Sequence, residues 1–214
     1  MSFLDELEAF KTTRLSPIVA AGQTSLADGS RSDRQALLQI ALANEISVSE
    51  LAALWIPTTA EVDVKLAFAR QAGDEAGHFQ LVADRLTALG FDITTYTPPA
   101  KNPLFEYLST LSTTVERIAA GLFTLESLAY AVNENFMAYC AAEGDDETVR
   151  IYREYIQPDE SAHQQLGARL LAKYASTPAL QEIARETVGR VLDIAAKTRA
   201  AASSRFGTAC LPGC

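Results

Sequence analysis

The sequence has few of the residues that form disulfides or bind metals. Its 214 residues include three cysteines and two histidines. An odd cysteine count without paired CxxC spacing argues against a disulfide scaffold and against a rubredoxin-like or zinc-ribbon site. The segment ACLPGC places Cys210 and Cys214 close together, where they could form a labile disulfide or bind adventitious metal. We expect a frayed, non-functional end instead, because terminal residues are commonly disordered.

Basic clusters and long apolar runs are also lacking. The first residues, MSFLDELEAF, carry acids where a secretory signal carries basic residues, and no apolar run approaches the roughly 18 residues that span a bilayer. A net charge of -9 with dispersed Lys and Arg argues against nucleic acid. We therefore expect a soluble, cytoplasmic protein without membrane or nucleic-acid partners. Residues 1–214 fit a single domain with one apolar core.

Strand signals are nearly absent, whereas apolar residues recur with the 3.6-residue helical period. We expect an all-α protein with a short N-terminal helix over about 2–12, then an irregular stretch containing Pro17. Further helices are predicted over about 33–55, 58–90, 104–142, 146–175 and 177–204, with a possible break near 112–114. The proline-rich stretch 91–103 is the long connection of the central region, and we expect it to cross between two helix hairpins.

Both histidines close the same Asp-Glu-x-x-His string. His78 ends GDEAGH and His163 ends PDESAH. The composition gives this coincidence a likelihood on the order of 10⁻⁵. Glu and His three residues apart on a helix project from one face, so each string presents a carboxylate and an imidazole to one point. One such string is often a chance neighbour pair, but two copies favour a site that holds two metal ions.

Two further carboxylates are predicted from the hairpin geometry. Residues that face each other in an antiparallel hairpin lie equally far from its turn. Glu126 and the second string have their midpoint near residue 144, inside EGDD, whereas Glu134 would move it by roughly 6 Å along the helix. Glu45 is preferred narrowly over Glu50 for the first hairpin. Both chosen residues also have apolar helical neighbours, where an unpaired carboxylate would be costly.

The predicted metal site has four carboxylates and two imidazoles: Glu45, Glu75, His78, Glu126, Glu160 and His163. Four carboxylates neutralise two divalent cations. Asp74 and Asp159 each lie four residues before a histidine, and we expect them to accept the imidazole N–H. A solvent-facing position is the alternative. Leu42, Phe123 and Tyr130 lie one turn from ligands and are candidates to line a substrate pocket, although residues at helical spacing are more often plain core.

This ligand pattern resembles the ferritin-like di-iron carboxylate superfamily over about residues 33–175. The resemblance implies a four-helix bundle with a crossover between its second and third helices. The short N-terminal helix and the C-terminal fifth helix expected from the sequence extend this bundle at both ends. Val82 stands where classical ribonucleotide reductase small subunits have their radical tyrosine. Ala129 stands where rubrerythrins have an additional glutamate, and Ala76 stands where bacterioferritin has its haem-ligating methionine. The remaining likeness is to the oxygenase and hydroxylase branch.

Membership of that branch implies two Fe ions, with Mn or mixed Fe/Mn as alternatives, that use O2 to oxidise a small organic or acyl substrate. No flavin or iron–sulfur signature is present, so electrons are expected from a separate reductase. A ferroxidase or iron-handling protein, a manganese catalase-like peroxide dismutase and an interaction subunit with a structural metal site are the alternatives. The residues leave the substrate and the oligomeric state open, with a homodimer as one candidate.

Overall fold

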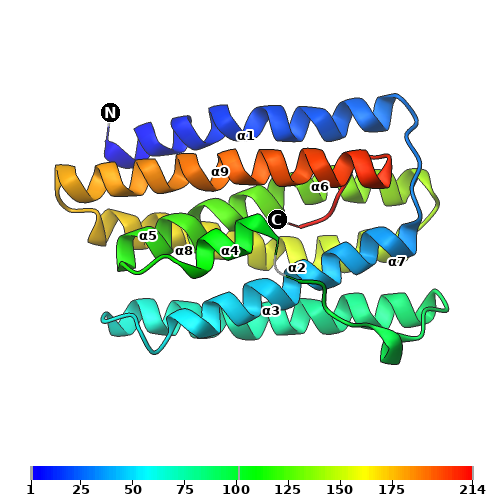
Figure 1. Ribbon diagram of the computed structural model, residues 1–214, viewed down its shortest axis with the longest axis horizontal. Helices are drawn as coiled ribbons and strands as arrows, with labels where there is room; N and C mark the ends of the chain where they lie inside the picture. Colours follow the sequence, from blue (N-terminus) through cyan, green and yellow to red (C-terminus); the bar gives the residue numbers. More distant parts are fainter. Residues whose placement is uncertain (1, 101, 214) are drawn as a thin grey trace.

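The computed structural model describes residues 2–100 and 102–213, and in them the protein is helical without strands. The long rods lie roughly parallel or antiparallel in one bundle (Figure 1). The helices are α1 (Phe3–Ala27), α2 (Arg34–Trp55), α3 (Val62–Ala88), α4 (Pro103–Ser109), α5 (Thr114–Ile118), α6 (Glu126–Ala142), α7 (Asp146–Ile151), α8 (Gln157–Tyr174) and α9 (Pro178–Phe206). The expected all-α fold is confirmed.

The first hairpin is formed by α2 and α3, which pack along each other (Figure 1). Asp33 caps α2 by accepting a hydrogen bond from the Gln35 amide. By length and composition α2 could cross a membrane, with a mean hydropathy of 1.3 over 18 residues. Half of that stretch is buried in the bundle and it carries the buried Glu45, as in a core helix.

The expected crossover joins α3 to α4. It contains a short 3-10 turn, η1 (Ile93–Thr95), and ends where Asn102 caps α4. The expected break near 112–114 is also present, because α4 stops at Ser109 and a capping box between Thr113 and Glu116 starts α5. Capping side chains therefore set both boundaries.

Two π-helical segments interrupt the rods of the second hairpin. Segment η2 (Ala119–Leu125) joins α5 to α6, and η3 (Tyr152–Ile156) joins α7 to α8. In each, a backbone N–H bonds the carbonyl five residues earlier, Glu126 to Gly121 and Gln157 to Tyr152. Such wide turns recur at functional sites. Here one ends directly before Glu126 and the other four residues before Glu160.

The expectation of a short N-terminal helix is wrong. Helix α1 continues through Pro17 to Ala27 and lies beside α9 along the bundle (Figure 1). It also packs on α6 at Gly22, where an added Cβ would lie 2.4 Å from Asn135 Nδ2. This long packing surface stabilises a helix whose one proline and one glycine lower its local propensity.

The expectation of a frayed C-terminal end is also wrong for the described residues. Thr208, Cys210 and Leu211 are at most 2% exposed. Their burial arises from contacts with residues far away in the sequence, which composition alone does not reveal. Cys214 lies outside the described residues, and with it the alternative of a Cys210–Cys214 pair.

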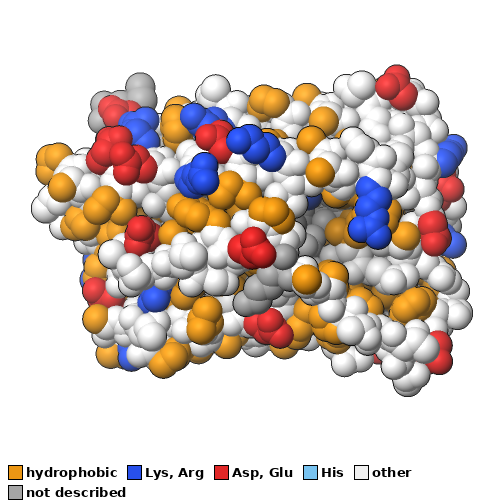
Figure 2. Space-filling view, in the orientation of Figure 1, with side chains coloured by type: hydrophobic (Ala, Val, Ile, Leu, Met, Phe, Trp, Pro, Cys, Tyr) orange, Lys and Arg blue, Asp and Glu red, His pale blue; other side chains and the backbone are white. Residues whose placement is uncertain are grey.

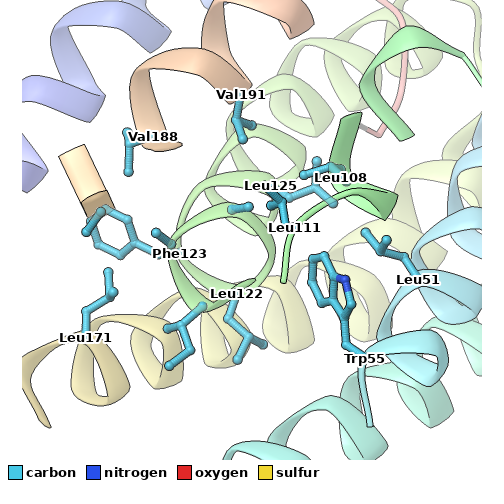
Figure 3. Packing of buried hydrophobic residues seen from close by; sticks show 14 of the residues in the cluster. Leu51, Trp55, Leu108, Leu111, Leu122, Phe123, Leu125, Leu171, Val188 and Val191 are labelled. Atoms are coloured by element: carbon cyan, nitrogen blue, oxygen red, sulfur yellow. The ribbon is translucent and has the colours of Figure 1, made fainter. Parts of the chain in front are cut away.

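The apolar core has two clusters at different levels of the bundle. One includes Phe68 together with Trp55 and Phe123, which are labelled in Figure 3. The other includes Leu42, Phe136 and Tyr152. On α2, Leu42 belongs to one cluster and Val48 to the other. Residues 160–163 are flanked in the same way, by Ile156 just before α8 and by Leu170 on α8. A polar layer lies between them.

Candidate metal centre

The polar layer contains the six residues expected to bind metal. Two overlapping groups each have ligand atoms within 4.8 Å of one another: Glu45, Glu75, His78 and Glu160, and then Glu75, Glu126, Glu160 and His163. All six side chains are buried. Glu75 and Glu160 belong to both groups. The structure thus brings the predicted set together from α2, α3, α6 and α8, whereas Glu50 and Glu134 are exposed.

The two imidazoles occupy equivalent positions. Nδ1 of His78 lies 3.5 Å from Glu45 Oε2 and 3.5 Å from Glu75 Oε2. Nδ1 of His163 lies 3.7 Å from Glu75 Oε1 and 3.6 Å from Glu126 Oε2. Each Nδ1 therefore faces one shared carboxylate and one carboxylate of its own group.

Several polar atoms in this layer are buried without a hydrogen-bond partner among the described residues. They are Glu75 Oε1, His78 Nδ1, Glu160 Oε2 and His163 Nδ1. A buried acceptor without a partner costs free energy, on the order of 1–3 kcal/mol. Metal coordination would satisfy these lone pairs.

The donor set fits metal ions. Carboxylate oxygens and imidazole nitrogens bind Fe, Mn or Zn at about 2.0–2.2 Å, so ligands of one ion lie roughly 3–4 Å apart. The spread of ligand atoms within each group agrees with that requirement. Two divalent cations would also balance the four carboxylates in a site that excludes water.

Two aspartates bond the outer imidazole nitrogens, each across the interface between α3 and α8. Nε2 of His78 lies 3.2 Å from Asp159 Oδ2, and Nε2 of His163 lies 2.9 Å from Asp74 Oδ2. Each aspartate thus contacts the histidine of the opposite helix and not the one four residues after it. Their carboxylates are 48% and 44% exposed, so they form the rim of the site.

Gln71 is a site residue that the sequence analysis missed. It is 1% exposed, and its amide Nε2 donates a hydrogen bond to Glu126 Oε1. It lies four residues before Glu75 on α3, and this helical spacing was the available signal. The bond orients a carboxylate that enters from the second hairpin.

The cluster shifts the pKa values of its members. Burial and the charge of Glu126 raise the pKa of Glu75 well above its usual value, and burial with the charges of Glu126 and Glu75 does the same at Glu160. Burial opposes the charge on Glu126 too, but contacts with Glu160, His163 and Gln71 outweigh it and lower its pKa.

The histidine pKa values move in the direction that nearby carboxylates impose. Burial lowers the pKa of His78, but Glu45 and Glu75 outweigh burial and raise it to about 11. Glu126, Glu75 and Asp74 raise the pKa of His163 to about 9 against the same effect of burial. Without cations, protons therefore balance the cluster.

The three candidates for a substrate pocket do not come together. Leu42 and Phe123 are fully buried in different apolar clusters, and Tyr130 is 36% exposed. Phe123 packs under Lys11, whose Nζ lies 3.8 Å from the ring centroid. A position one turn from a ligand does not determine the direction in which a side chain points. At Phe123 the π-helical segment η2 also rotates the side chains relative to those of a regular α-helix.

Comparisons with known proteins identify a family and a fold. No curated protein matches the sequence. A domain of unknown function from Shewanella denitrificans OS217, described as having a heme oxygenase-like fold, superimposes with a TM-score of 0.72 at 16% identity, covering 98% of this chain and 97% of that chain. This likeness shows an all-α fold. A family model described as "Protein of unknown function (DUF455)" matches residues 18–204. The chain therefore belongs to the DUF455 family.

Proposed function

We propose that the protein is an O2-dependent oxidoreductase that uses a two-ion centre, with iron as the expected metal, to oxidise a small organic substrate. The observation that carries the proposal is that Glu75 and Glu160 are shared by two overlapping ligand groups. A carboxylate common to two groups suits a bridging position between two cations. The resemblance to di-iron carboxylate oxygenases supports iron and O2.

Each residue of the cluster has a distinct role in this proposal. Glu75 and Glu160 would serve both ions, Glu45 and Glu126 would each serve one, and the imidazoles would bind through Nδ1. Asp159 and Asp74 accept hydrogen bonds from the Nε2–H groups of His78 and His163, which fixes the tautomer with a free Nδ1 lone pair. Gln71 holds Glu126 in place.

The apolar surroundings of the polar layer also contribute to the proposed chemistry. The apolar clusters on either side of the polar layer exclude water and strengthen electrostatic interactions within it. When bound, Fe(II) would supply electrons that reduce O2. Electrons for repeated turnover are expected from a separate reductase, since the sequence carries no flavin or iron–sulfur signature.

The heme oxygenase-like description belongs to the structural neighbour, and the imidazoles here favour metal ions over a haem. Haem iron needs an axial ligand such as a histidine nitrogen. Nδ1 of each histidine faces two carboxylates and Nε2 lies beside an aspartate. The free Nδ1 of each ring therefore points among carboxylates, a setting that suits a metal ion held by carboxylates and imidazole better than the axial position of a haem.

Anaerobic loading with Fe(II) followed by O2 tests the proposal against iron storage. We expect binding to saturate at two ions per chain, with O2 uptake that stops when those ions are oxidised and resumes on addition of a reductant. Iron that keeps accumulating as Fe(III) well beyond two ions would indicate a ferroxidase and contradict the proposal. Loading a separate portion of the metal-free protein with Mn(II) and adding peroxide tests the catalase alternative.

A further inference from the structure

The chain after α9 enters the bundle instead of following its surface. Residues 208–213, here called the tail, are all buried except for the half-buried Ala209. Figure 1 shows the end of the chain running from α9 toward α2. Ser25 of α1 holds its start, since its Oγ lies 3.1 Å from Thr208 Oγ1 and accepts the Ala209 N–H at 3.0 Å.

Three polar side chains bind the tail through its backbone. Arg199 of α9 donates to the carbonyls of Leu211 and Gly213, at 2.5 and 2.7 Å. The Asn44 amide of α2 donates to the Pro212 carbonyl at 3.1 Å, and Asn133 Oδ1 of α6 accepts the Gly213 N–H at 2.9 Å. Such bonds can be exchanged for bonds to water or to a ligand when the tail leaves.

The end of the tail lies next to the candidate metal centre. Asn44 precedes Glu45 in α2. Asn133 also donates to Gln157 Oε1, at 3.4 Å, and Gln157 lies three residues before Glu160, on the same side of α8. Gly213 therefore contacts Asn44, which is adjacent to Glu45 in sequence, and Asn133, which in turn contacts Gln157. It approaches so closely that a Cβ would lie 2.8 Å from Asn44 Nδ2.

A surface cavity of about 560 Å³ reaches the same point from outside. It is lined by Ala43 and Asn44 of α2, by Tyr96 and Phe105 from the crossover and α4, and by Arg205 and Phe206 at the end of α9. The space-filling view shows a hollow on this face (Figure 2). Asn44 thus borders both the cavity and the tail, and the helix end that leads into the tail forms one wall.

We propose that the tail is a gate between this cavity and the metal centre. In the arrangement described here it closes the space between Asn44 and Asn133. Its departure joins the cavity to the polar layer and gives a small molecule a route to the ligands of α2 and α8. This inference rests on the proposed function, because it treats the cluster as the centre that a substrate must reach.

Chemical modification of the histidines measures access without any metal. The protein has only two histidines, and both belong to the cluster, so their carbethoxylation by diethyl pyrocarbonate reports entry of a small reagent. All variants are compared at pH 9, because the reagent attacks the unprotonated imidazole and the pKa of His163 is about 9. The test variant is Gly213→Ala, because this glycine has φ +67° and its Cβ would displace Asn44 or the tail. Gly144→Ala is the matched control, with φ +72° and nothing within 4 Å of the added Cβ.

We expect Gly213→Ala to accelerate histidine modification at least about tenfold, because local opening no longer has to break the tail's hydrogen bonds. Gly144→Ala should react at the wild-type rate. Alkylation of Cys210, located by peptide mass spectrometry, reports independently that the tail has moved, since this thiol is buried. A chain that stops after Gly207 gives the fully open case, with circular dichroism to verify its helices.

The proposal is overturned if Cys210 becomes reactive while the histidines keep their wild-type rate. If Gly213→Ala leaves Cys210 protected, the shortened chain, which lacks Cys210, decides by its histidine rate alone, and a wild-type rate with intact helices overturns the gate. Loss of helix in the shortened chain, together with wild-type histidine rates in Gly213→Ala, would assign the tail a structural role and also overturn the gate. Absence of metal binding would instead contradict the proposed function. The histidine and cysteine modification rates are measured without metal and do not depend on it.

Discussion

Nε2 of His163 on α8 lies 2.9 Å from Oδ2 of Asp74 on α3, and the reciprocal contact joins His78 of α3 to Asp159 of α8. These crossed pairs connect the two helix hairpins directly at the polar layer. The same hydrogen bonds that orient each imidazole therefore also fix the spacing between the two DExxH helices.

Replacing Asp74 with alanine should weaken metal binding without removing a ligand. His163 would lose the acceptor for its Nε2 proton, and loss of such a partner typically reduces metal affinity about 10–100-fold. Competition with a chelator of known affinity measures the effect. Asp84→Ala is the control, since Asp84 is an exposed residue of the same helix that bonds Gln80. Equal affinities in both variants would show that the Asp74 contact is incidental.

Glu75→Gln should have opposite effects on stability and on metal binding. Burial and neighbouring charge raise the pKa of Glu75, so its charged form destabilises the metal-free fold. An uncharged amide should raise the free energy of unfolding of the metal-free protein at pH 8, by roughly 1 kcal/mol or more. It should also abolish binding of two ions, because a bridging carboxylate is lost.

Urea unfolding and metal titration measure these two effects on the same sample. Glu50→Gln, on an exposed position of α2, should alter neither quantity. A destabilised metal-free Glu75→Gln protein would argue that the carboxylate stabilises the fold by itself.

The metal affinity should rise with pH. His163 and His78 have pKa values raised to about 9 and about 11 from 6.5, and the pKa values of Glu75 and Glu160 are also raised. Metal ions bind the deprotonated forms, so they must displace these protons at pH 7. We expect the metal affinity to increase steadily as the pH rises from 6.5 to 9. Binding should also release protons, and calorimetry in buffers of different ionisation enthalpy measures their number.

The same groups should make the metal-free protein less stable over this range. A group whose pKa is raised on folding contributes stability that is present below its unfolded pKa and is lost as the pH rises through its folded pKa. Thermal unfolding of the metal-free protein at pH 6.5 and 9 tests the sign. A melting temperature that increases over this interval would contradict the proton-balanced cluster.

Gly167→Ala should be strongly destabilising, because α8 contacts the backbone of η2 there. An added Cβ would lie 2.7 Å from the Leu122 carbonyl carbon and 2.7 Å from the Phe123 nitrogen. Backbone cannot move aside as a flexible side chain can, so we expect a loss of about 1–3 kcal/mol or more. Gly73→Ala is the matched helical control, with nothing within 4 Å of its Cβ. It should stabilise α3 by roughly 0.5–1 kcal/mol.

Urea unfolding of both glycine variants provides the measurement. Equal free energies of unfolding would show that α8 does not depend on this close approach to η2.

Much of the site follows from helical periodicity. The spacing of Glu75 and His78 places them on one face of a helix whatever surrounds it, and the hairpin midpoint selects Glu126 over Glu134. The structure brings the selected residues together and leaves Glu134 exposed. The crossover and the break before α5 could also be predicted, since proline, asparagine and capping residues determine them locally.

Features that depend on contacts between distant segments could not be predicted in this way. The crossed bonds of Asp74 and Asp159 require the relative position of α3 and α8, and the π-helical segments have no recognisable sequence pattern. Helix α1 continues beyond Pro17 because α6 and α9 support it. The tail is ordered by hydrogen bonds with Asn44, Asn133 and Arg199. These residues lie on α2, α6 and α9, so the local sequence of the tail does not reveal the contacts.

Elemental analysis of the protein after reconstitution with Fe(II), in the wild type and in the His78→Ala/His163→Ala double variant, tests the central claim most directly. We expect two ions per wild-type chain and no stoichiometric metal in the double variant, with its helical circular dichroism largely intact. Equal metal content in the two proteins would contradict the assignment of these six side chains as a metal centre.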